Sequence, residues 1–536
     1  MDRFDANILE IHHLREQNIQ LQKKNEQLEK QVQVLQQKSE VQENTITLLK
    51  NKLFGSKSEK CKPAADENDP QMSLFNETEQ AADPSVPDPT NTDEAVTEVK
   101  GYKRKKKGAR KIDLDAFPQE TVMHDLPEEE RICKECGHPL HFIGEELHHR
   151  EIVLIPVQIK VVNHKCRSYE CRYCRAHELP YVHKPACPKP VIPHSAASAS
   201  LITAIAEAKY VHAVPLYRQE QIFKDMNLPL PRATMANWMI WTGREYLEPL
   251  AALLKEELLK QPVLHADETP VQVHKEKGRP NKSKSFVWVY TSGCYETARP
   301  VVLMEYHPGR SAAFAKDMLA DYEGYIHTDD YSGYHWIDPA RHVLCMVHAR
   351  RKFSEAKKAA GDAATPIADE ALERIGKLFT IERDLQNMSP EKRQDERNKR
   401  AKPVLYELFA WAKSILEQMT IKNRLSNALN YLVSNEKGLM RYLDSGMCEL
   451  SNNMAENSIR PFVVGRKNWL FCDTPRGART SAVIYSMIET AKANGLNPGK
   501  YLEYILSGLS NEEYPGRKET LEQYLPWNPE VQAYCK

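Results

Sequence analysis

The stretch VLHADET, residues 263–269, decides the fold class, because it joins a short apolar strand (263–266) to the acid Asp267. The stretch GYIHTDDYSGY, residues 324–334, repeats this pattern, with a strand over 324–327 followed by Asp329 and Asp330. Acids that follow neighbouring strands of one sheet lie close together, and close carboxylates repel unless cations neutralise them. Taken singly, each Asp is more often a helix cap or a surface residue. As a pair they suit Mg²⁺ or Mn²⁺, which support phosphodiester chemistry.

The pattern around these acids is that of a mixed α/β domain. Runs rich in β-branched and aromatic residues predict further strands over 286–290, 300–304 and 342–345, and a helix is expected over 311–319. Residues 366–443 are almost wholly helical in pattern, and Ser389-Pro390 has the cap and first-turn proline of a helix start. The sequence therefore predicts an α/β core that carries a helical insertion.

A third acid lies in NNMAENSIRP, residues 452–461, which precedes GRKNW at 465–469. Glu456 and Arg460 are four residues apart, which puts them on one face of a helix. A plain surface ion pair is one interpretation. The other is a DNA-gripping surface, because basic residues and an aromatic ring follow directly. The residues of this surface are Arg460, Arg466, Lys467, Asn468 and Trp469.

The N-terminal segment has a seven-residue repeat of Leu14, Leu21, Leu28 and Leu35, with no Gly or Pro before Gly55. This spacing favours a left-handed coiled coil, and the seam residues Asn18 and Asn25 favour a parallel dimer. A single amphipathic helix packed on its own chain is the alternative. The polar character of the remaining faces favours oligomerisation.

Charge is segregated in the segment that follows, although 74 basic and 74 acidic residues give the chain zero formal net charge. Residues 64–99 contain ten acids and no Lys or Arg, and this acidic linker is expected to be disordered. Residues 100–111 contain eight basic residues and no acid. A solvated linker and a contact with the DNA backbone both fit this run. Its candidate DNA-binding residues are Lys103, Arg104, Lys105, Lys106, Lys107 and Arg110.

Four of the twelve cysteines form two Cys-x-x-Cys pairs, Cys133/Cys136 and Cys171/Cys174. Two such pairs predict a closed, structural Zn²⁺ site, since four thiolates leave no open coordination position. A redox dithiol is the weaker interpretation, and Cys166 and His164 are treated as bystanders. The segment 151–162 between the pairs is β-branched and predicts one or two strands.

Residues 196–250 change to a helical pattern. Residues 215–240 predict two helices joined by a turn that contains prolines. A helix-turn-helix that binds DNA and two packed helices with no such role fit this segment equally well.

The length of 536 residues predicts roughly three or four domains. No apolar run approaches the length of about 18 residues that a membrane span requires. The first residues, MDRFDANILEIHH, lack the pattern of a signal peptide. We therefore expect a cytoplasmic protein with no membrane partner.

Four motifs together resemble a known family: HADET (265–269), HTDDYSGY (327–334), HARRKF (348–353) and NNMAENSIRPFVVGRKNWLF (452–471). They resemble transposase C of the sixty-six class of bacterial insertion sequences. The resemblance covers nearly the whole chain. It also includes KLFGSKSEK (52–60), HDLPEEERICKECG (124–137), AKYVHAVPLYRQEQIF (208–223) and the terminal YLPWN (524–528).

The resemblance implies a DDE transposase with a ribonuclease-H-like core, in which Asp267, Asp329 and Glu456 are the three catalytic, Mg²⁺-binding acids. Members of the family usually have Gly after the second acid, where this chain has Asp330. The following Tyr-x-Gly-Tyr favours Asp329 as the second acid, with Asp330 as the alternative. Cys345 and His348 resemble a Cys-x-x-His feature of several transposase groups, and we expect a structural role for them.

The expected architecture is multidomain. The fold class combines an N-terminal coiled coil, a small zinc-binding module, a helical DNA-binding region and a ribonuclease-H-like α/β core with an α-helical insertion. The expected bounds are 1–55 for the coiled coil, 56–112 for the linker and basic run, 113–185 for the zinc module, 186–250 for the helical region, 251–475 for the core with its insertion at about 360–445, and 476–536 for a helical tail.

The expected activity is binding of the inverted-repeat ends of an insertion sequence, followed by metal-dependent cleavage and strand transfer. Expected partners are terminal and target DNA, a second copy of the chain, and two accessory proteins of the same element. A dimeric, zinc-containing DNA-binding regulator derived from a transposase is the alternative. A nonspecific metal-dependent nuclease is a third interpretation.

Overall fold

The computed structural model describes residues 20–25, 28, 31–32, 158–165, 169–170, 182–183 and 187–536, apart from 296–297, 362–363 and 420–421. The chain divides into two compact units, residues 57–162 and the remainder. Nearly all described residues belong to the second unit. The basic run at 103–111 and the four paired cysteines lie outside the described residues.

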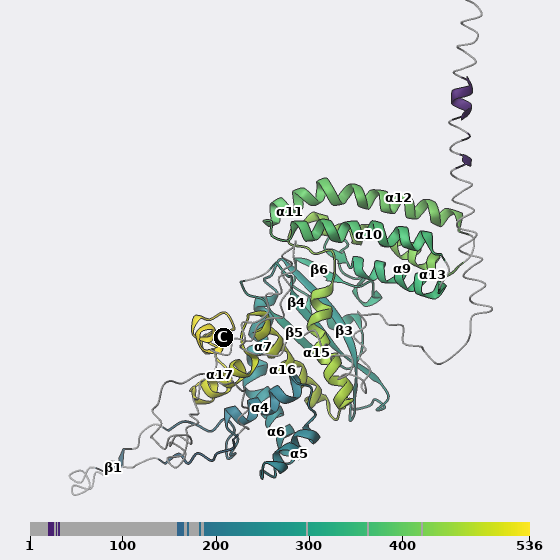
Figure 1. Cartoon of the computed structure of the whole chain (residues 1–536). Coiled ribbons are helices and arrows are strands. Elements are labelled where there is room, and N and C mark those ends of the chain that lie inside the picture. Colours follow the sequence, from purple (N-terminus) through teal and green to yellow (C-terminus); the bar gives the residue numbers. More distant parts are fainter. Residues whose placement is uncertain are drawn as a thin grey trace, which may run out of the picture. The chain divides into compact units, whose positions relative to one another are not determined.

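A six-stranded mixed sheet forms the centre of the larger unit, in the order β5-β4-β3-β6-β7, with β8 paired to part of β3 (Figure 1). Strands β3, β4 and β5 pair antiparallel, whereas β3, β6 and β7 pair parallel. The five strands expected from the sequence between residues 263 and 345 each overlap one of these. The strand bounds are β3 (Val263–Val273), β4 (Lys284–Ser292), β5 (Val302–His307), β6 (Tyr325–Thr328), β7 (His342–Leu344) and β8 (Phe471–Cys472).

Strand β3 is unpaired along part of one edge, and this unpaired part is called the gap below. Val263 to His265 pair with β6, and Gln272 and Val273 pair with β8, so only β4 flanks residues 266–271. Pro270 is tolerated here because a residue without an N–H fits best where one side of the strand is unpaired. The sequence predicted that the strand ends before Asp267. That boundary was wrong, because pairing with β4 continues to Gln272 and leaves Asp267 in mid-strand, beside the gap.

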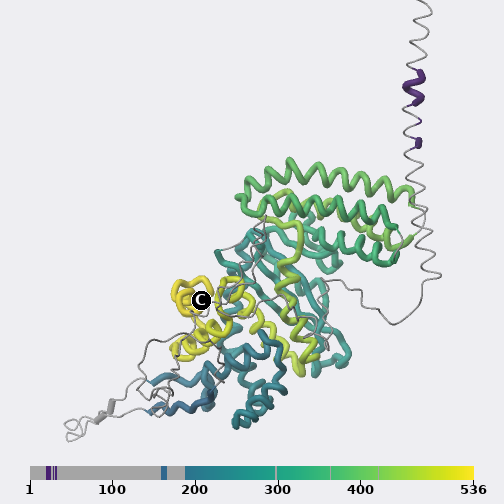
Figure 2. Tube along the Cα trace, viewed as in Figure 1, coloured from purple at the N-terminus to yellow at the C-terminus, as the bar shows by residue number. Residues whose placement is uncertain are grey.

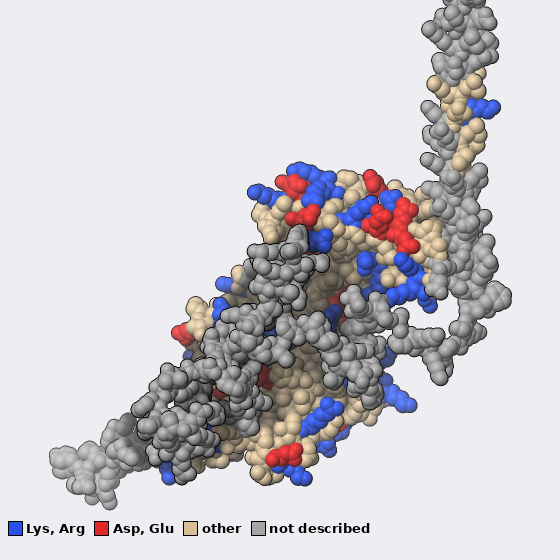
Figure 3. All heavy atoms as spheres, viewed as in Figure 1, with Lys and Arg blue, Asp and Glu red and all other residues tan. Residues whose placement is uncertain are grey.

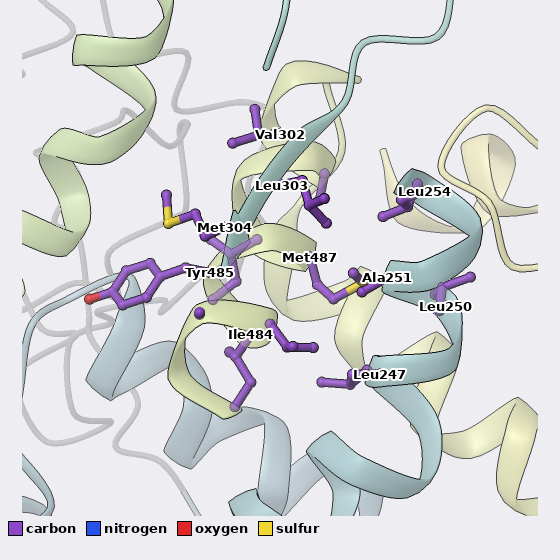
Figure 4. Close-up of a cluster of buried hydrophobic side chains, with 14 of the residues drawn as sticks. Leu247, Leu250, Ala251, Leu254, Val302, Leu303, Met304, Ile484, Tyr485 and Met487 are labelled. Carbon is purple, nitrogen blue, oxygen red and sulfur yellow. The ribbon is translucent and has the colours of Figure 1, made fainter. Parts of the chain in front are cut away.

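Helix α16 (Pro475–Ala493) covers the edge strand β5 and lies within the segment expected to be a tail. The amide of Met304 donates to Ser486 Oγ at 2.7 Å, and the amide of Val302 donates to Thr490 Oγ1 at 3.0 Å. These bonds occupy strand-edge groups that otherwise attract other chains. Figure 4 shows the apolar core at this place, between β5, α16 and a helix formed by η3 (Gly243–Leu247) and α7 (Glu248–Leu258).

Three further helices precede η3 and α7 in the chain: α4 (Ala199–Tyr210), α5 (Leu216–Asp225) and α6 (Arg232–Thr242). The last two are the helix pair predicted over 215–240. All three share one apolar core with α16 and with α17 (Pro498–Asn511). The chain ends in α18 (Lys518–Glu522) and α19 (Pro529–Cys535).

The segment predicted to be helical over 366–443 is helical in the structure, and its helices follow β7 (Figure 2). Their buried side chains form a second hydrophobic core together with residues of β3 and β7. Ser389 accepts a hydrogen bond from the Lys392 amide and Pro390 occupies the first turn, which confirms the predicted helix start. The helices are α9 (Met346–Ala360), α10 (Pro366–Leu385), α11 (Pro390–Glu396), η5 (Arg397–Ala401), α12 (Lys402–Gln418), α13 (Arg424–Ser434), α14 (Glu436–Met440) and η6 (Arg441–Asp444).

The remaining elements are α8 (Ala312–Met318), η4 (Ser332–Tyr334), α15 (Asn453–Trp469) and the short antiparallel pair β1 (Tyr169–Glu170) and β2 (Val182–His183). Residues 158–165 have no regular structure, so the strand predicted over 151–162 does not extend through its described end. Across the described ranges, no helix has the length and apolar character needed to cross a bilayer.

Candidate functional site

Asp267 is the acid that lies beside the gap in β3. Its Oδ1 accepts a hydrogen bond from the amide of Glu268 at 2.8 Å. The pKa of Asp267 is raised to about 8. Burial is the main cause, the charges of Glu268, Asp329 and Glu456 add to it, and the hydrogen bond from that amide opposes it. The three predicted acids therefore share one electrostatic environment.

The two candidates for the second acid have different surroundings. Asp329 accepts one hydrogen bond, from the amide of Tyr331 to Oδ1 at 3.0 Å. Asp330 contacts two side chains, because its Oδ1 lies 3.0 Å from Nε2 of His335 and its Oδ2 accepts from Nδ2 of Asn435 at 2.9 Å. Asp329, and not Asp330, contributes to the raised pKa of Asp267. Asp330 thus has the contacts of a structural residue.

Glu456 lies in the first turn of α15 and faces α9. Its Oε1 lies 3.7 Å from Nε2 of His348, and its Oε2 lies 3.4 Å from Nη2 of Arg351. Oε1 is buried and accepts no hydrogen bond from the described residues. Within these residues Arg460 forms no ion pair with Glu456, so the simple surface pair expected as one interpretation does not form.

The chemistry of this donor set fits a divalent cation. Asp267 is a largely buried carboxylate that forms no ion pair within the described residues, and Oε1 of Glu456 accepts no hydrogen bond there. Placing a hard cation between such carboxylates removes their mutual repulsion. In the described part of the chain, however, no three His, Cys, Asp or Glu side chains are already close enough together to hold an ion.

Glu268, the residue next to Asp267, has a cationic partner and a hydrogen-bond donor of its own. Nε of Arg310 donates to its Oε1 at 2.5 Å, and the hydroxyl of Tyr334 donates to its Oε2 at 2.6 Å. The guanidinium of Arg310 also stacks on the ring of Tyr331, 3.4 Å from its centroid. Of the two adjacent acids in β3, only Asp267 therefore lacks a cationic partner in the described chain.

A pair of buried histidines, which sequence reasoning missed, lies on β3 and β6 just before the acids. His265 and His327 each stand two residues before an acid and face each other in the β3–β6 register. Their rings stack with centroids 4.4 Å apart and planes 8° apart. Burial lowers the pKa of His327 well below its ordinary value. Glu449 joins the pair, since its amide donates to Nε2 of His327 at 3.1 Å and its Oε1 lies 3.0 Å from Nε2 of His265.

Asn452 connects the helix of Glu456 to the strand of Asp267. It is the N-cap residue of α15, yet its side chain makes no capping bond. Instead its Nδ2 donates to the carbonyl of Ala266 at 2.9 Å, and its Oδ1 lies 2.9 Å from Nδ1 of His265. Its amide donates to Sγ of Cys345 at 3.1 Å. The repeated His-x-Asp of 265–267 and 327–329 and the double Asn of 452–453 are the sequence signals of this network.

The predicted DNA-binding residues at the end of α15 have mixed surroundings. Nη1 of Arg466 donates to Thr269 Oγ1 at 3.1 Å, and partial burial lowers the pKa of Arg466. Asn468 donates to the carbonyl of Ala213 at 3.1 Å. Trp469 packs edge-on against Phe462 and is partly buried, so its ring is no open platform. Lys467 and Arg460 are exposed.

Four family models match the chain. The model described as the IS66 transposase family matches residues 194–480, which include all three acids, and the IS66 C-terminal element matches 486–527. The zinc-finger binding domain of transposase IS66 matches 130–175, a range that contains the four paired cysteines. A model described as transposase C of IS166 homeodomain matches 42–122. These matches define a transposase with a zinc-finger domain. The chain belongs to the IS66 transposase family.

Curated relatives match over most of the chain. The uncharacterized protein y4jD of Sinorhizobium fredii (strain NBRC 101917 / NGR234) is 29% identical over 462 residues, which cover 83% of this chain and 87% of the relative. The uncharacterized protein y4hP of the same strain is 26% identical over 454 residues, which cover 81% and 79%. No solved structure matches the chain.

Proposed function

We propose that this transposase binds the inverted-repeat ends of its insertion sequence, cleaves them and joins the freed 3′-hydroxyl to target DNA, with Asp267, Asp329 and Glu456 holding Mg²⁺ or Mn²⁺. The observation that supports the proposal is that the three acids lie on adjacent elements: Asp267 on β3, Asp329 directly after the neighbouring strand β6, and Glu456 on α15, which contacts β3. When bound, such ions activate an attacking oxygen and stabilise the leaving oxygen. Water supplies the first nucleophile and the 3′-hydroxyl the second.

We infer that the core is ribonuclease-H-like. The support is topological: three antiparallel strands are followed by two parallel strands on the other side of β3. The first acid lies on the central strand, the second directly follows β6, and the third lies on a helix after the sheet. The chain's own groups would position the acids, with Arg310 and Tyr334 fixing Glu268 and thereby the backbone beside Asp267.

The remaining modules fit the same function. Residues 20–25, 28 and 31–32 are helical, and the heptad side chains Leu21, Leu28 and Val32 are exposed, which supports pairing with a second copy of the chain. We assign structural Zn²⁺ to Cys133, Cys136, Cys171 and Cys174, and contact with the DNA backbone to the basic run at 103–111. Because its substrate is DNA of the cell, the protein is expected to act in the cytoplasm, together with two accessory proteins of the element.

The test is cleavage of a labelled duplex taken from the DNA that flanks the gene. Full-length protein with Mg²⁺ should cut at the element end, and chelation of the metal should stop the reaction. Binding without any cleavage would instead support the alternative of a zinc-containing regulator. Cleavage with no preference for ends would support a nonspecific nuclease.

Asp329 and Asp330 should respond differently to removal of their charge. We expect Asp329→Asn to lower end cleavage by about 10³-fold, because loss of a metal ligand removes several kcal/mol of transition-state stabilisation. Asp330→Asn has nearly the same shape and can still accept a hydrogen bond from one of the two partners, His335 or Asn435, so it should lower cleavage less than about tenfold. The measurement is the single-turnover cleavage rate of each variant. A larger loss in Asp330→Asn than in Asp329→Asn would make Asp330 the second acid.

Asn452 is expected to act as a positioning residue for the cation. Asn452→Ala removes the side-chain link between α15 and β3, so binding of Mn²⁺, followed by electron paramagnetic resonance, should weaken by about tenfold or more. The adjacent, exposed Asn453→Ala is the matched control and should bind Mn²⁺ like the parent protein. Unchanged Mn²⁺ affinity in a folded Asn452→Ala protein would show that the link is merely structural.

A further inference from the structure

The β3–β4 hairpin, residues 274–284, carries five basic residues and a single acid, Glu276. That acid is buried, and its charge is neutralised inside the hairpin. Its Oε2 accepts from Nη1 of Arg279 at 2.5 Å, and its Oε1 accepts from Oγ of Ser285 at 2.6 Å. The outer face of the hairpin is therefore cationic. The lysines that are exposed and form no ion pair within the described chain are Lys277, Lys282 and Lys284.

The segment that follows α15 adds further cations beside this hairpin, since Phe471 pairs with Gln272 of β3. Asp473 is the only acid between Glu456 and Glu489, and its carboxylate accepts from Nζ of Lys275 at 2.6 Å. Helix α16 also begins here, and a helix N-terminus carries partial positive charge. Figure 3 shows Lys and Arg side chains at the margin of the core where β3 reaches its hairpin. The exposed basic residues at the end of α15 and the start of α16 are Lys467, Arg476 and Arg479.

Two large apolar side chains are exposed among these cations. Leu470 is 66% exposed and Phe471 is 43% exposed. Leu470 has φ of 64°, a left-handed conformation that is strained for a leucine. The ring of Phe471 stacks on His274, with centroids 4.2 Å apart, and forms an open flat face. A partner that offers both phosphates and flat rings or sugars is DNA.

We propose that the hairpin surface binds the DNA beside the cleavage site. The contact lies about five base pairs from the phosphate that is cleaved next to Asp267. We define this surface as residues 274–284 with Lys467, Leu470, Phe471, Arg476 and Arg479. Its lysines would contact phosphates, and the Phe471–His274 face would contact a sugar or base. Gln272, opposite Phe471, lies five residues beyond Asp267 on β3, which is about 17 Å at about 3.4 Å per residue. Duplex DNA rises about 3.4 Å per base pair, so that span equals about five pairs.

The first experiment combines Lys277→Gln, Lys282→Gln and Lys284→Gln in the full chain. With duplex from the element end, the slope of log affinity against log salt should become shallower by about 0.9 for each phosphate that the variant no longer neutralises. Hydroxyl-radical protection should disappear about five base pairs from the cut and persist at the cut itself. The matched control replaces three exposed lysines of the helical insertion, and it should change neither the slope nor the protection. Those lysines are Lys392, Lys422 and Lys437.

Unchanged protection in the hairpin variant, or an equal loss of protection in the control, would overturn the proposal. The distance between the protected region and the cut rests on the proposed function. Binding itself is measured without cleavage and does not depend on that function. A parent protein that shows the protected flank and never cuts ends would therefore contradict the proposed function alone.

The second experiment tests the ring face. Phe471→Ala should weaken binding of the same duplex by about tenfold, whereas Phe471→Tyr should retain the parent affinity, because stacking needs only a flat ring. Tyr514→Ala removes another exposed ring, one that lies against Arg517 elsewhere in the chain, and serves as the control. If Phe471→Ala binds like the parent, the ring face has no part in DNA binding.

Discussion

Asp267→Asn should abolish end cleavage and strand transfer while raising the melting temperature of the metal-free protein. The rate should fall by about 10³-fold or more, because the amide cannot replace a carboxylate as a ligand of a hard cation. Stability should rise because the carboxylate of Asp267 is largely buried and forms no ion pair within the described residues, with a pKa raised to about 8. Opposite changes in activity and stability distinguish a catalytic acid from a structural one.

The gain in stability should depend on pH in a definite direction. The pKa of Asp267 is about 8 in the folded protein against an ordinary 3.8, so the folded state disfavours the charged form. Stability is therefore lost as pH rises from about 4 to about 8. In chelator, the melting temperature of Asp267→Asn should exceed that of the parent by a margin that grows across this range.

The control for this change is Asp321→Asn, because Asp321 is exposed and lies away from the acids in the sequence. It should alter neither the cleavage rate nor the melting temperature. A folded Asp267→Asn protein that cuts ends at the parent rate would refute the assignment. A fall in melting temperature together with the loss of cleavage would instead give Asp267 a structural role.

Arg397→Met should destabilise the helical insertion by about 3–5 kcal/mol, because it leaves a buried carboxylate without its counter-ion. The side chain of Arg397 is fully buried. Its Nε and Nη2 donate to the two oxygens of Glu382 at 2.9 Å and 2.6 Å. Its Nη1 also donates to the carbonyls of Tyr442 and Ser445, at 3.3 Å and 3.0 Å. Urea unfolding followed by circular dichroism measures the effect.

A matched control lies three residues away. Arg400 pairs with Asp384 at 2.6 Å, but both side chains are 40% or more exposed. Arg400→Met should therefore change stability by about 1 kcal/mol or less. Replacing both members of the buried pair, as in Arg397→Met with Glu382→Leu, should recover much of the stability. Equal effects of Arg397→Met and Arg400→Met would show that burial of the first pair has no energetic consequence.

The strands and the helical insertion were predictable because their signals are local. Apolar runs placed the strands β3 to β7 but not β8, and Ser389-Pro390 marked a helix start that the structure confirms. The end of strand β3 was not predictable from the residues near Asp267. The strand continues past Asp267 because it pairs with β4, which lies further along the chain. The role of α16 escaped for the same reason, since Ser486 and Thr490 acquire their function only beside β5.

The sequence pattern and the resemblance identified the acids of the candidate site. They did not identify the residues that surround and position these acids. His265 and His327 form a stacked pair only because the parallel register of β3 and β6 aligns them. Asn452 is the N-cap residue of α15, and only the fold shows that its side chain bonds to β3 instead of capping the helix. Trp469 looked like the exposed ring, but packing on Phe462 buries it, and Phe471 is exposed in its place.

The insertion between the second and third acids has a consequence for synthesis of the protein. Asp329 and Glu456 are 127 positions apart in the sequence. At about 5–20 residues per second, the ribosome adds the third acid roughly 6–25 seconds after the second. An emerging or truncated chain thus contains two acids and lacks the helix of the third. With the role proposed for Glu456, such a chain would lack nuclease activity, which would arise only once translation has passed the helices between β7 and α15.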